Sequence, residues 1–149
     1  MTKTDGLALD DQLCFATYTA AQAFSRVYRP LLDPLGLTYS QYLVMLVLWE
    51  GDDIPIGKIT ARIHLDSGTL TPLLKRMEKS GLITRHRNPK DEREVRVSLT
   101  TQGRDLRSKV AVARAEVACA TNLENADIDT LKQQLLKLRT DLLAHLPDV

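Results

Sequence analysis

The chain has 149 residues and a formal net charge of +1, with 44% hydrophobic and 26% charged residues. This length suits a single domain with its own core, and the composition is typical of a soluble globular protein rather than of a disordered or fibrous one. The longest apolar run, residues 42–49, is too short to span a bilayer, and the N-terminus lacks the pattern of a signal peptide, so we expect a cytoplasmic protein without a membrane partner.

The first two predicted elements are helices. Asp10 or Asp11 suits the N-cap of the first, in which apolar residues recur every seven positions, at Leu13, Ala20 and Val27. Pro30 and Pro34 are expected to break it. The second helix starts at about residue 40 and continues to Gly51, and its nearly continuous apolar character predicts burial on most sides.

The third helix opens at Pro55, and the fourth shows the clearest helical pattern. Apolar residues of the fourth lie at i, i+3, i+4 and i+7, namely Leu70, Leu73, Leu74 and Met77, and Gly81 ends it. Pro72 leaves its start open: either Thr69 is the cap and Pro72 lies in the first turn, or the helix starts at Ser67 and bends. The polar face carries hydroxyls and cations that can bind phosphates and base edges: Ser67, Thr69, Thr71, Lys75, Arg76 and Lys79.

From Leu82 the apolar period becomes two, which predicts strands over 82–87 and 95–99. The segment between them opens with Asn88-Pro89-Lys90-Asp91, which is typical of a turn, so we expect a two-stranded hairpin with a charged tip. Two long helices close the chain, with apolar rows at Leu106, Val110, Ala113 and Val117 and at Leu131, Leu135, Leu138 and Leu142.

Basic residues concentrate between Lys75 and Arg96. Eight basic and four acidic residues leave this stretch at +4, so the rest of the chain carries −3. A basic segment on a slightly acidic body is an electrostatic footprint for phosphate, although an ordinary solvated face would show the same excess.

Three short helices followed by a basic hairpin predict a winged helix-turn-helix, mainly α-helical with a small β-hairpin wing. In this architecture the fourth helix enters the major groove. We expect one domain over 1–149, with the winged helix at about 38–100 and dimerisation helices at 8–35 and 101–146. A second copy would bury the apolar faces of the long helices, and such a homodimer presents two recognition helices to a pseudo-palindromic, double-stranded operator. The competing interpretation is a structural helical bundle that binds no DNA.

The two cysteines, Cys14 and Cys119, are too few and too far apart for a zinc cluster or a disulfide scaffold. The histidines also lack ligand spacing, so neither a metal nor another cofactor is expected; they are His64, His86 and His145. A lone cysteine on an apolar stripe is most often a small core residue. If Asp10 caps the first helix, however, Cys14 lies in the first turn, where the helix dipole favours a thiolate.

The segment LDSGTLTPLLKRM at 65–77 resembles the MarR family, the multiple-antibiotic-resistance regulators. The segments GLI at 81–83 and LTTQG at 99–103, with the wing pair Asp91 and Arg93, fit the same pattern, and the resemblance covers nearly the whole chain. Within the family, the segment SGTLTP and an early cysteine resemble the organic hydroperoxide resistance regulators, with matches at Leu13, Cys14, Phe15, Tyr28 and Tyr39. Cys119 further resembles the second thiol of the two-cysteine subgroup.

The resemblance implies that Arg93 inserts into the minor groove while Asp91 steadies it; a surface ion pair in a turn is the alternative. It also implies that Tyr28 and Tyr39 support the Cys14 thiolate. Tyr28 lies fourteen positions after Cys14, about 21 Å along a straight helix. Unless that helix is broken, only the partner's Tyr28 can reach Cys14.

The implied function is a redox-sensing transcriptional regulator, which we expect to be a repressor and not an enzyme. An organic hydroperoxide oxidises Cys14 to a sulfenic acid, Cys119 of the other subunit traps it as a disulfide, and the dimer leaves its operator. Two other functions stay open: a MarR-type repressor released by a small phenolic ligand, and a thiol peroxidase. The peroxidase would leave the basic wing unexplained.

Overall fold

The computed structural model describes residues 6–147, which divide after Arg114 into two compact units. The first unit holds helices α1 to α4, a small antiparallel sheet and most of α5. The second holds the end of α5 and the whole of α6.

Helix α1 covers Leu13–Leu32 and begins later than expected. Leu9–Asp11 form a turn of 3-10 helix, so the acidic residues lie before α1 rather than at its N-cap. Gln12 occupies the N-cap position without a side-chain capping bond. The prediction that Asp10 or Asp11 caps this helix is therefore wrong.

Pro30 lies inside α1 and does not break it. The proline removes one amide donor near the C-terminal end, but the helix continues to Leu32, and the Asp33 amide donates to the Arg29 carbonyl. Cys14 is the second residue of this helix, and Tyr28 lies in its last third. The backbone between them is one continuous helix, which fixes their separation at about 21 Å by the helical rise.

Helices α2 (Tyr39–Glu50) and α3 (Ile56–Ile63) follow as predicted. A capping box starts α2: Thr38 Oγ1 accepts the Gln41 amide at 3.2 Å, and the Gln41 side chain accepts the Thr38 amide at 3.1 Å. Six of the twelve α2 residues are buried, which agrees with the expectation of burial on most sides.

Helix α4 (Ser67–Lys79) begins at Ser67, with Pro72 in its interior. The Asp66 carboxylate caps the helix by accepting the Thr69 amide at 2.7 Å. The predicted apolar row is confirmed, because Leu70, Leu73, Leu74 and Met77 are all buried. They join a core whose fully buried side chains come from α1 to α4 and the sheet, including Leu32, Met45, Leu48, Ile59 and Val97.

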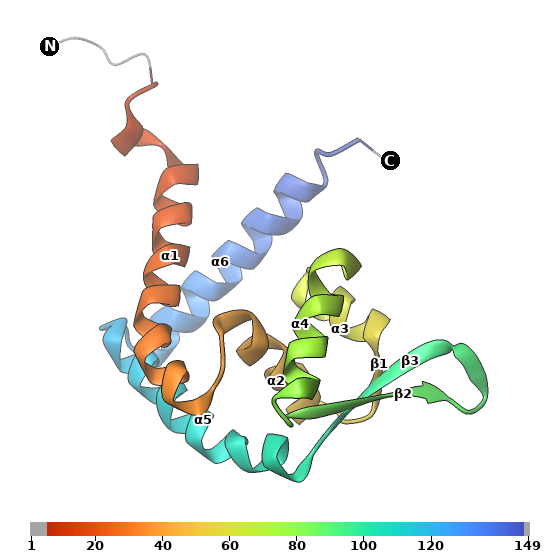
Figure 1. The fold of residues 1–149 in the computed structure, drawn as a ribbon. Helices are drawn as coiled ribbons and strands as arrows, with labels where there is room; N and C mark the ends of the chain where they lie inside the picture. The colour runs from red at the N-terminus through yellow and green to blue at the C-terminus, as the bar shows by residue number, and fades with distance from the viewer. Residues whose placement is uncertain (1–5, 148–149) are drawn as a thin grey trace, which may run out of the picture. The chain divides into compact units, whose positions relative to one another are not determined.

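The sheet has three strands, not the two expected. β2 (Ile83–Asn88) and β3 (Asp91–Leu99) form the predicted hairpin, although β3 begins at Asp91 rather than at the expected position 95. β1 (Ile54–Pro55) pairs with the other edge of β3. A two-residue strand carries no periodicity, which is why the pattern missed it. Figure 1 shows the β2–β3 hairpin extending away from α3 and α4 as a wing. The added strand ties the base of the wing to the loop after α2.

Helix α5 (Thr101–Ala120) starts at a tight junction with α2 and β2. The Trp49 indole donates to the Gly103 carbonyl at 3.0 Å, and Thr100 Oγ1 accepts the Gly103 amide at 3.0 Å. Of the predicted apolar row of α5, Val110, Ala113 and Val117 are buried, and Leu106 is partly exposed.

We expect Gly103→Ala to lower the free energy of unfolding by about 1–3 kcal/mol. A Cβ there would lie 2.2 Å from the Leu82 carbonyl oxygen, which is backbone and already accepts the Thr100 amide at 3.1 Å. Urea denaturation would measure the loss. Gly57→Ala is the matched control, because its Cβ meets nothing within 4 Å and α3 should gain about 0.5–1 kcal/mol from alanine. Equal effects at both sites would contradict this packing argument.

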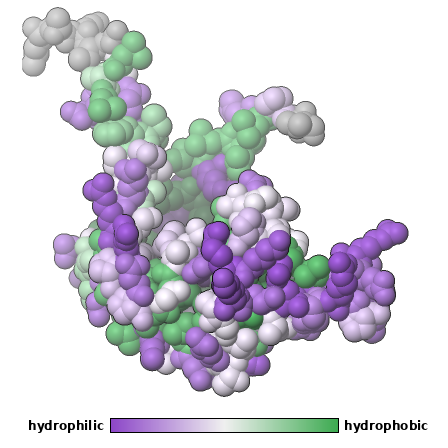
Figure 2. Space-filling model, viewed as in Figure 1, coloured by the Kyte–Doolittle hydropathy of each residue, from purple (hydrophilic) through white to green (hydrophobic). Residues whose placement is uncertain are grey.

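Large apolar side chains stay exposed on the two long terminal helices. α6 (Asn125–Leu143) has no buried residue, and its exposed leucines include Leu131, Leu135, Leu136 and Leu142. On α1, Leu13 is 65% exposed and Phe24 is 45% exposed. Figure 2 shows hydrophobic surface on both helices. Within each unit, these faces are therefore left uncovered.

Over the described range 6–147, no single helix is long and apolar enough to cross a bilayer. Only the bent pair 13–35 and 39–50 passes, by length and composition alone, when its two members are taken together.

Candidate functional site

The exposed side of α4 carries the polar residues that the sequence singled out. Ser67, Thr69, Lys75, Arg76 and Lys79 are exposed, and Thr71 is partly exposed. This orientation follows from the buried apolar row on the opposite side of the helix. The pKa of Asp66 is held below its usual value, chiefly by the hydrogen bond from the Thr69 amide, so the cap stays charged and the first turn stays ordered.

The eight basic residues of the 75–96 stretch fall into two groups. Arg85 pairs with Glu78 at 2.8 Å, and Arg96 pairs with Glu94 at 2.8 Å. Arg87 donates to the Glu92 carbonyl. The other five are exposed and have no ion-pair partner among residues 6–147: Lys75, Arg76, Lys79, Lys90 and Arg93. These five cations are therefore free to meet phosphates.

The tip of the wing is shaped by two side chains that accept backbone amides. Asn88 Oδ1 accepts the Lys90 amide at 3.0 Å, and Asp91 Oδ1 accepts the Arg93 amide at 3.1 Å. In the described chain the Arg93 guanidinium forms no ion pair with Asp91 or with another acid. Asp91 thus positions the backbone of Arg93 and leaves its charge unneutralised. Figure 2 shows the wing as a hydrophilic protrusion.

An unpredicted polar cluster anchors the base of the wing. The Asp53 carboxylate accepts hydrogen bonds from Arg96 Nε at 3.1 Å and from Ser98 Oγ at 3.3 Å, and its Oδ1 lies 3.1 Å from His86 Nε2. The hydrogen bond from Arg96 is the main reason that the pKa of Asp53 lies below its usual value. Asp53 and Arg96 are 43 positions apart, so no local pattern could have paired them.

Both cysteines are exposed, and neither forms a disulfide in the described chain. Cys14 therefore does not occupy the core, which removes the main argument for a purely structural thiol. It lies in the first turn of α1, where backbone amides have no intrahelical acceptor. Cys119 lies at the C-terminal end of α5.

Three tyrosines from α1 and α2 form a cluster. The ring centroid of Tyr28 lies 5.5 Å from that of Tyr39 and 5.0 Å from that of Tyr42. The hydroxyl oxygens of Tyr28 and Tyr42 are 3.2 Å apart. The structure thus brings together the two tyrosines named from the sequence and adds Tyr42. Its spacing of three from Tyr39, on one side of α2, is the signal that could have found it.

Burial raises the pKa of two of these phenols, Tyr28 and Tyr39. It is the largest cause that raises the pKa of Tyr28 and Tyr39 above the usual value, and for Tyr28 the hydrogen bond with Tyr42 adds to it while the Arg114 guanidinium opposes it. Neutral phenols are hydrogen-bond donors, so the cluster can stabilise an anion. It cannot serve Cys14 of its own chain, because α1 holds the two about 21 Å apart.

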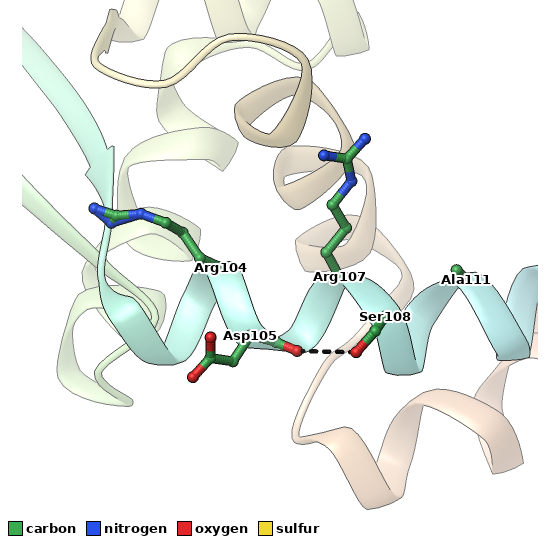
Figure 3. A pocket seen from close by; sticks show the side chains of 5 residues that line it. All are labelled: Arg104, Asp105, Arg107, Ser108 and Ala111. Atoms are coloured by element: carbon green, nitrogen blue, oxygen red, sulfur yellow. Dashed lines mark hydrogen bonds between the residues drawn. The ribbon is translucent and has the colours of Figure 1, made fainter.

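The first unit also has a surface depression on α5. A depression of about 640 Å³ on α5 is lined by residues of that one helix, as Figure 3 shows: Arg104, Asp105, Arg107, Ser108 and Ala111. Figure 3 also shows Arg104 and Arg107 extending from the helix without converging on one point. Across the part of the chain that the structure describes, no three His, Cys or acidic side chains are placed to hold a metal ion.

The chain was compared with known protein families and sequences. A family model described as transcriptional regulator SarA/Rot matches residues 26–110. The HTH-type transcriptional regulator TtmR of Methylorubrum extorquens is 46% identical over 143 residues, covering 96% of this chain and 73% of that protein. The organic hydroperoxide resistance transcriptional regulator of Bacillus subtilis is 43% identical over 136 residues, covering 91% and 92%.

Solved structures of AbfR, a Staphylococcus epidermidis protein, share the fold. Reduced AbfR bound to DNA gives a TM-score of 0.77 at 34% identity, with 91% of this chain and 94% of that chain covered. The disulfide form of AbfR gives 0.65 at 36% identity, with 87% and 91% covered. The predicted winged helix-turn-helix architecture is therefore confirmed.

Proposed function

The chain belongs to the MarR and SarA type of winged-helix transcriptional regulators, and we propose that it is a homodimeric repressor released from DNA when an organic hydroperoxide oxidises Cys14. Its relatives are regulators, which is a class of non-enzymes. A regulator acts where the DNA is, so we place the protein in the cytoplasm.

One observation carries the proposal: the exposed thiol and the tyrosine cluster lie at opposite ends of one unbroken helix. Within residues 6–147 neither forms the proposed site alone, because no hydrogen bond to the Cys14 thiol is formed there and the tyrosine cluster holds no anion. A two-fold dimer in which the helices cross in antiparallel fashion would bring Cys14 to the partner's Tyr28 and the partner's Tyr39. The exposed apolar side chains of α1 and α6 supply the surface that such a dimer would bury.

The chemistry at Cys14 is a two-electron oxidation of sulfur. The thiolate attacks one peroxide oxygen, the S–O bond forms and the O–O bond breaks. The leaving alkoxide takes a proton and departs as the alcohol, and Cys14 becomes a sulfenic acid. The relative in Bacillus subtilis, named as an organic hydroperoxide regulator, supports this class of oxidant.

A second thiol would make the switch resettable. The Cys119 thiol of the other subunit attacks the sulfenic sulfur, an S–S bond forms and water leaves. Because bridged Cα atoms must lie within about 7 Å, any wider gap has to close by backbone movement, which is the signal to the DNA-binding part. The disulfide form of AbfR supports such a step in a protein of this fold.

DNA binding would use α4 and the wing. Ser67, Thr69, Thr71, Lys75 and Arg76 would face the major groove and its phosphates, while Asp91 holds the backbone from which Arg93 reaches the minor groove. The DNA-bound form of AbfR supports this docking. A hundredfold loss of DNA affinity on oxidation needs only about 2.7 kcal/mol of preference for the released conformation.

The test is a gel-shift titration of the DNA upstream of the protein's own gene. Reduced dimer should bind with an affinity that falls steeply with salt, and stoichiometric cumene hydroperoxide should release it. A phenolic ligand in parallel should have no effect. Release by the ligand alone would move the function to a non-redox repressor, continued turnover of peroxide with a thiol reductant would indicate a peroxidase, and failure to bind any DNA would refute the proposal.

A further inference from the structure

The Tyr42 hydroxyl is a buried polar group to which the proposed function assigns no task. Only 4% of Tyr42 is exposed, and the one hydrogen-bond partner of its hydroxyl among residues 6–147 is the Tyr28 hydroxyl, at 3.2 Å. Its ring also packs against Tyr39, with 5.8 Å between centroids, but no hydrogen bond joins those two hydroxyls. Tyr42 therefore acts on the cluster through Tyr28.

Counting protons decides the direction of this hydrogen bond. Each phenol has one proton to donate, and either oxygen of the pair could be the donor. If Tyr28 donates to Tyr42, the Tyr28 proton is not available to an approaching thiolate, and the buried Tyr42 proton has no acceptor among residues 6–147. If Tyr42 donates to Tyr28, the Tyr28 proton is free for the thiolate, and both protons are used.

We propose that Tyr42 is a positioning residue that orients and strengthens Tyr28 as the donor to the partner's Cys14 thiolate, through the chain Tyr42 to Tyr28 to sulfur. This inference rests on the proposed function. Hydrogen bonds in such a chain polarise one another, so the donation from Tyr42 makes Tyr28 a stronger donor to an anion. Tyr39 acts in parallel, since its hydroxyl is not part of this chain of bonds.

The charged surroundings are compatible with this role. On α5, Arg114 is the cation whose field reaches Tyr28, and it favours negative charge at the cluster. From α1 and α2, the groups that face Tyr28 are the rings of Tyr39 and Tyr42, and burial raises the pKa of Tyr39 above its usual value. A neutral relay that donates toward sulfur is thus the state that these neighbours support.

The experiment measures the pH profile of iodoacetamide alkylation of Cys14 in the full-length dimer. Cys119→Ser serves as the parent, so that Cys14 is the thiol whose alkylation is measured. In Tyr42→Phe the profile should move to higher pH, and at a pH below its midpoint the thiolate fraction should fall roughly two- to fourfold. Tyr28→Phe should move it further. DNA affinity of the reduced dimer and the melting temperature should stay near the parent's, because phenylalanine keeps the ring.

Double variants separate a relay from packing. Adding Tyr42→Phe to Tyr28→Phe should change nothing more, whereas adding it to Tyr39→Phe should multiply the two effects. An unchanged profile in Tyr42→Phe, or the same loss with and without the Tyr28 hydroxyl, would overturn the relay while leaving the redox sensor intact. A Cys119→Ser parent whose Cys14 is not oxidised by peroxide would refute the proposed function, and the relay with it.

Discussion

Cys14→Ser is expected to bind operator DNA as tightly as the parent chain and to stay bound when cumene hydroperoxide is added. Serine keeps the size of the side chain and removes the oxidisable sulfur, at an exposed position where no core packing is lost. The parent should lose about a hundredfold in affinity, which corresponds to about 2.7 kcal/mol. Gel-shift titration before and after peroxide treatment measures both values.

Cys119→Ser is the matched control, since it removes the other exposed thiol and keeps the sensor. Peroxide-treated parent should run on non-reducing gels as a dimer, which dithiothreitol should convert to monomer by reducing the disulfide. Both serine variants should run as monomers. In Cys119→Ser, mass spectrometry should find Cys14 as sulfenic or higher acids, because no second thiol traps it. Peroxide release that persists in Cys14→Ser would place the sensor elsewhere. A monomer band from the parent would leave a one-cysteine sensor.

Local patterns predicted α4 and the wing because each has a strong short-range cause. The i, i+3, i+4, i+7 row of α4 fixes which side is buried, so the exposure of Lys75 and Arg76 follows from the sequence. The switch to a period of two at Leu82 gave the wing, and the Asn88–Asp91 turn gave its tip. These features depend on neighbours a few positions away.

Features that depend on distant pairing could not be predicted in the same way. Strand β1 exists because Ile54 pairs with Val97, and two residues have no period of their own. The anchor at Asp53 needs Arg96, which the sheet register brings to it. The prediction of the α1 cap failed for a different reason. Asp10 is a good capping residue, but it lies in a 3-10 turn that precedes the helix, so it does not occupy the N-cap position.

The candidate redox site lies between these two cases. The resemblance named Tyr28 and Tyr39, and the structure brings their rings together, but the role of Tyr42 depends on how α1 and α2 pack. The helical rise over fourteen positions predicted the separation of Cys14 from Tyr28 for an unbroken helix, and the continuous α1 helix fulfils that condition. What no single chain can supply is the second copy, on which the proposed thiolate environment depends.

Arg93→Ala is expected to weaken operator binding by roughly ten- to a hundredfold, because the proposed dimer would lose one DNA contact from each of its two wings. The Arg93 side chain is exposed and has no acidic partner in residues 6–147, so its removal leaves no unpaired charge in the protein and the fold should be unaffected. Fluorescence anisotropy across a salt series measures the affinity and its salt dependence, and the slope should become shallower.

The control for charge is Arg107→Ala on α5, which also removes one exposed cation but lies outside α4 and the wing. It should change affinity less than Arg93→Ala does. Arg93→Lys separates charge from shape, because a lysine retains the charge but lacks the planar guanidinium that suits a narrow groove. Operators with A·T-rich flanks should suffer the greater loss in both Arg93 variants. Equal losses at G·C-rich flanks would exclude the minor-groove contact, and an unchanged affinity in Arg93→Ala would show that Arg93 does not contact DNA.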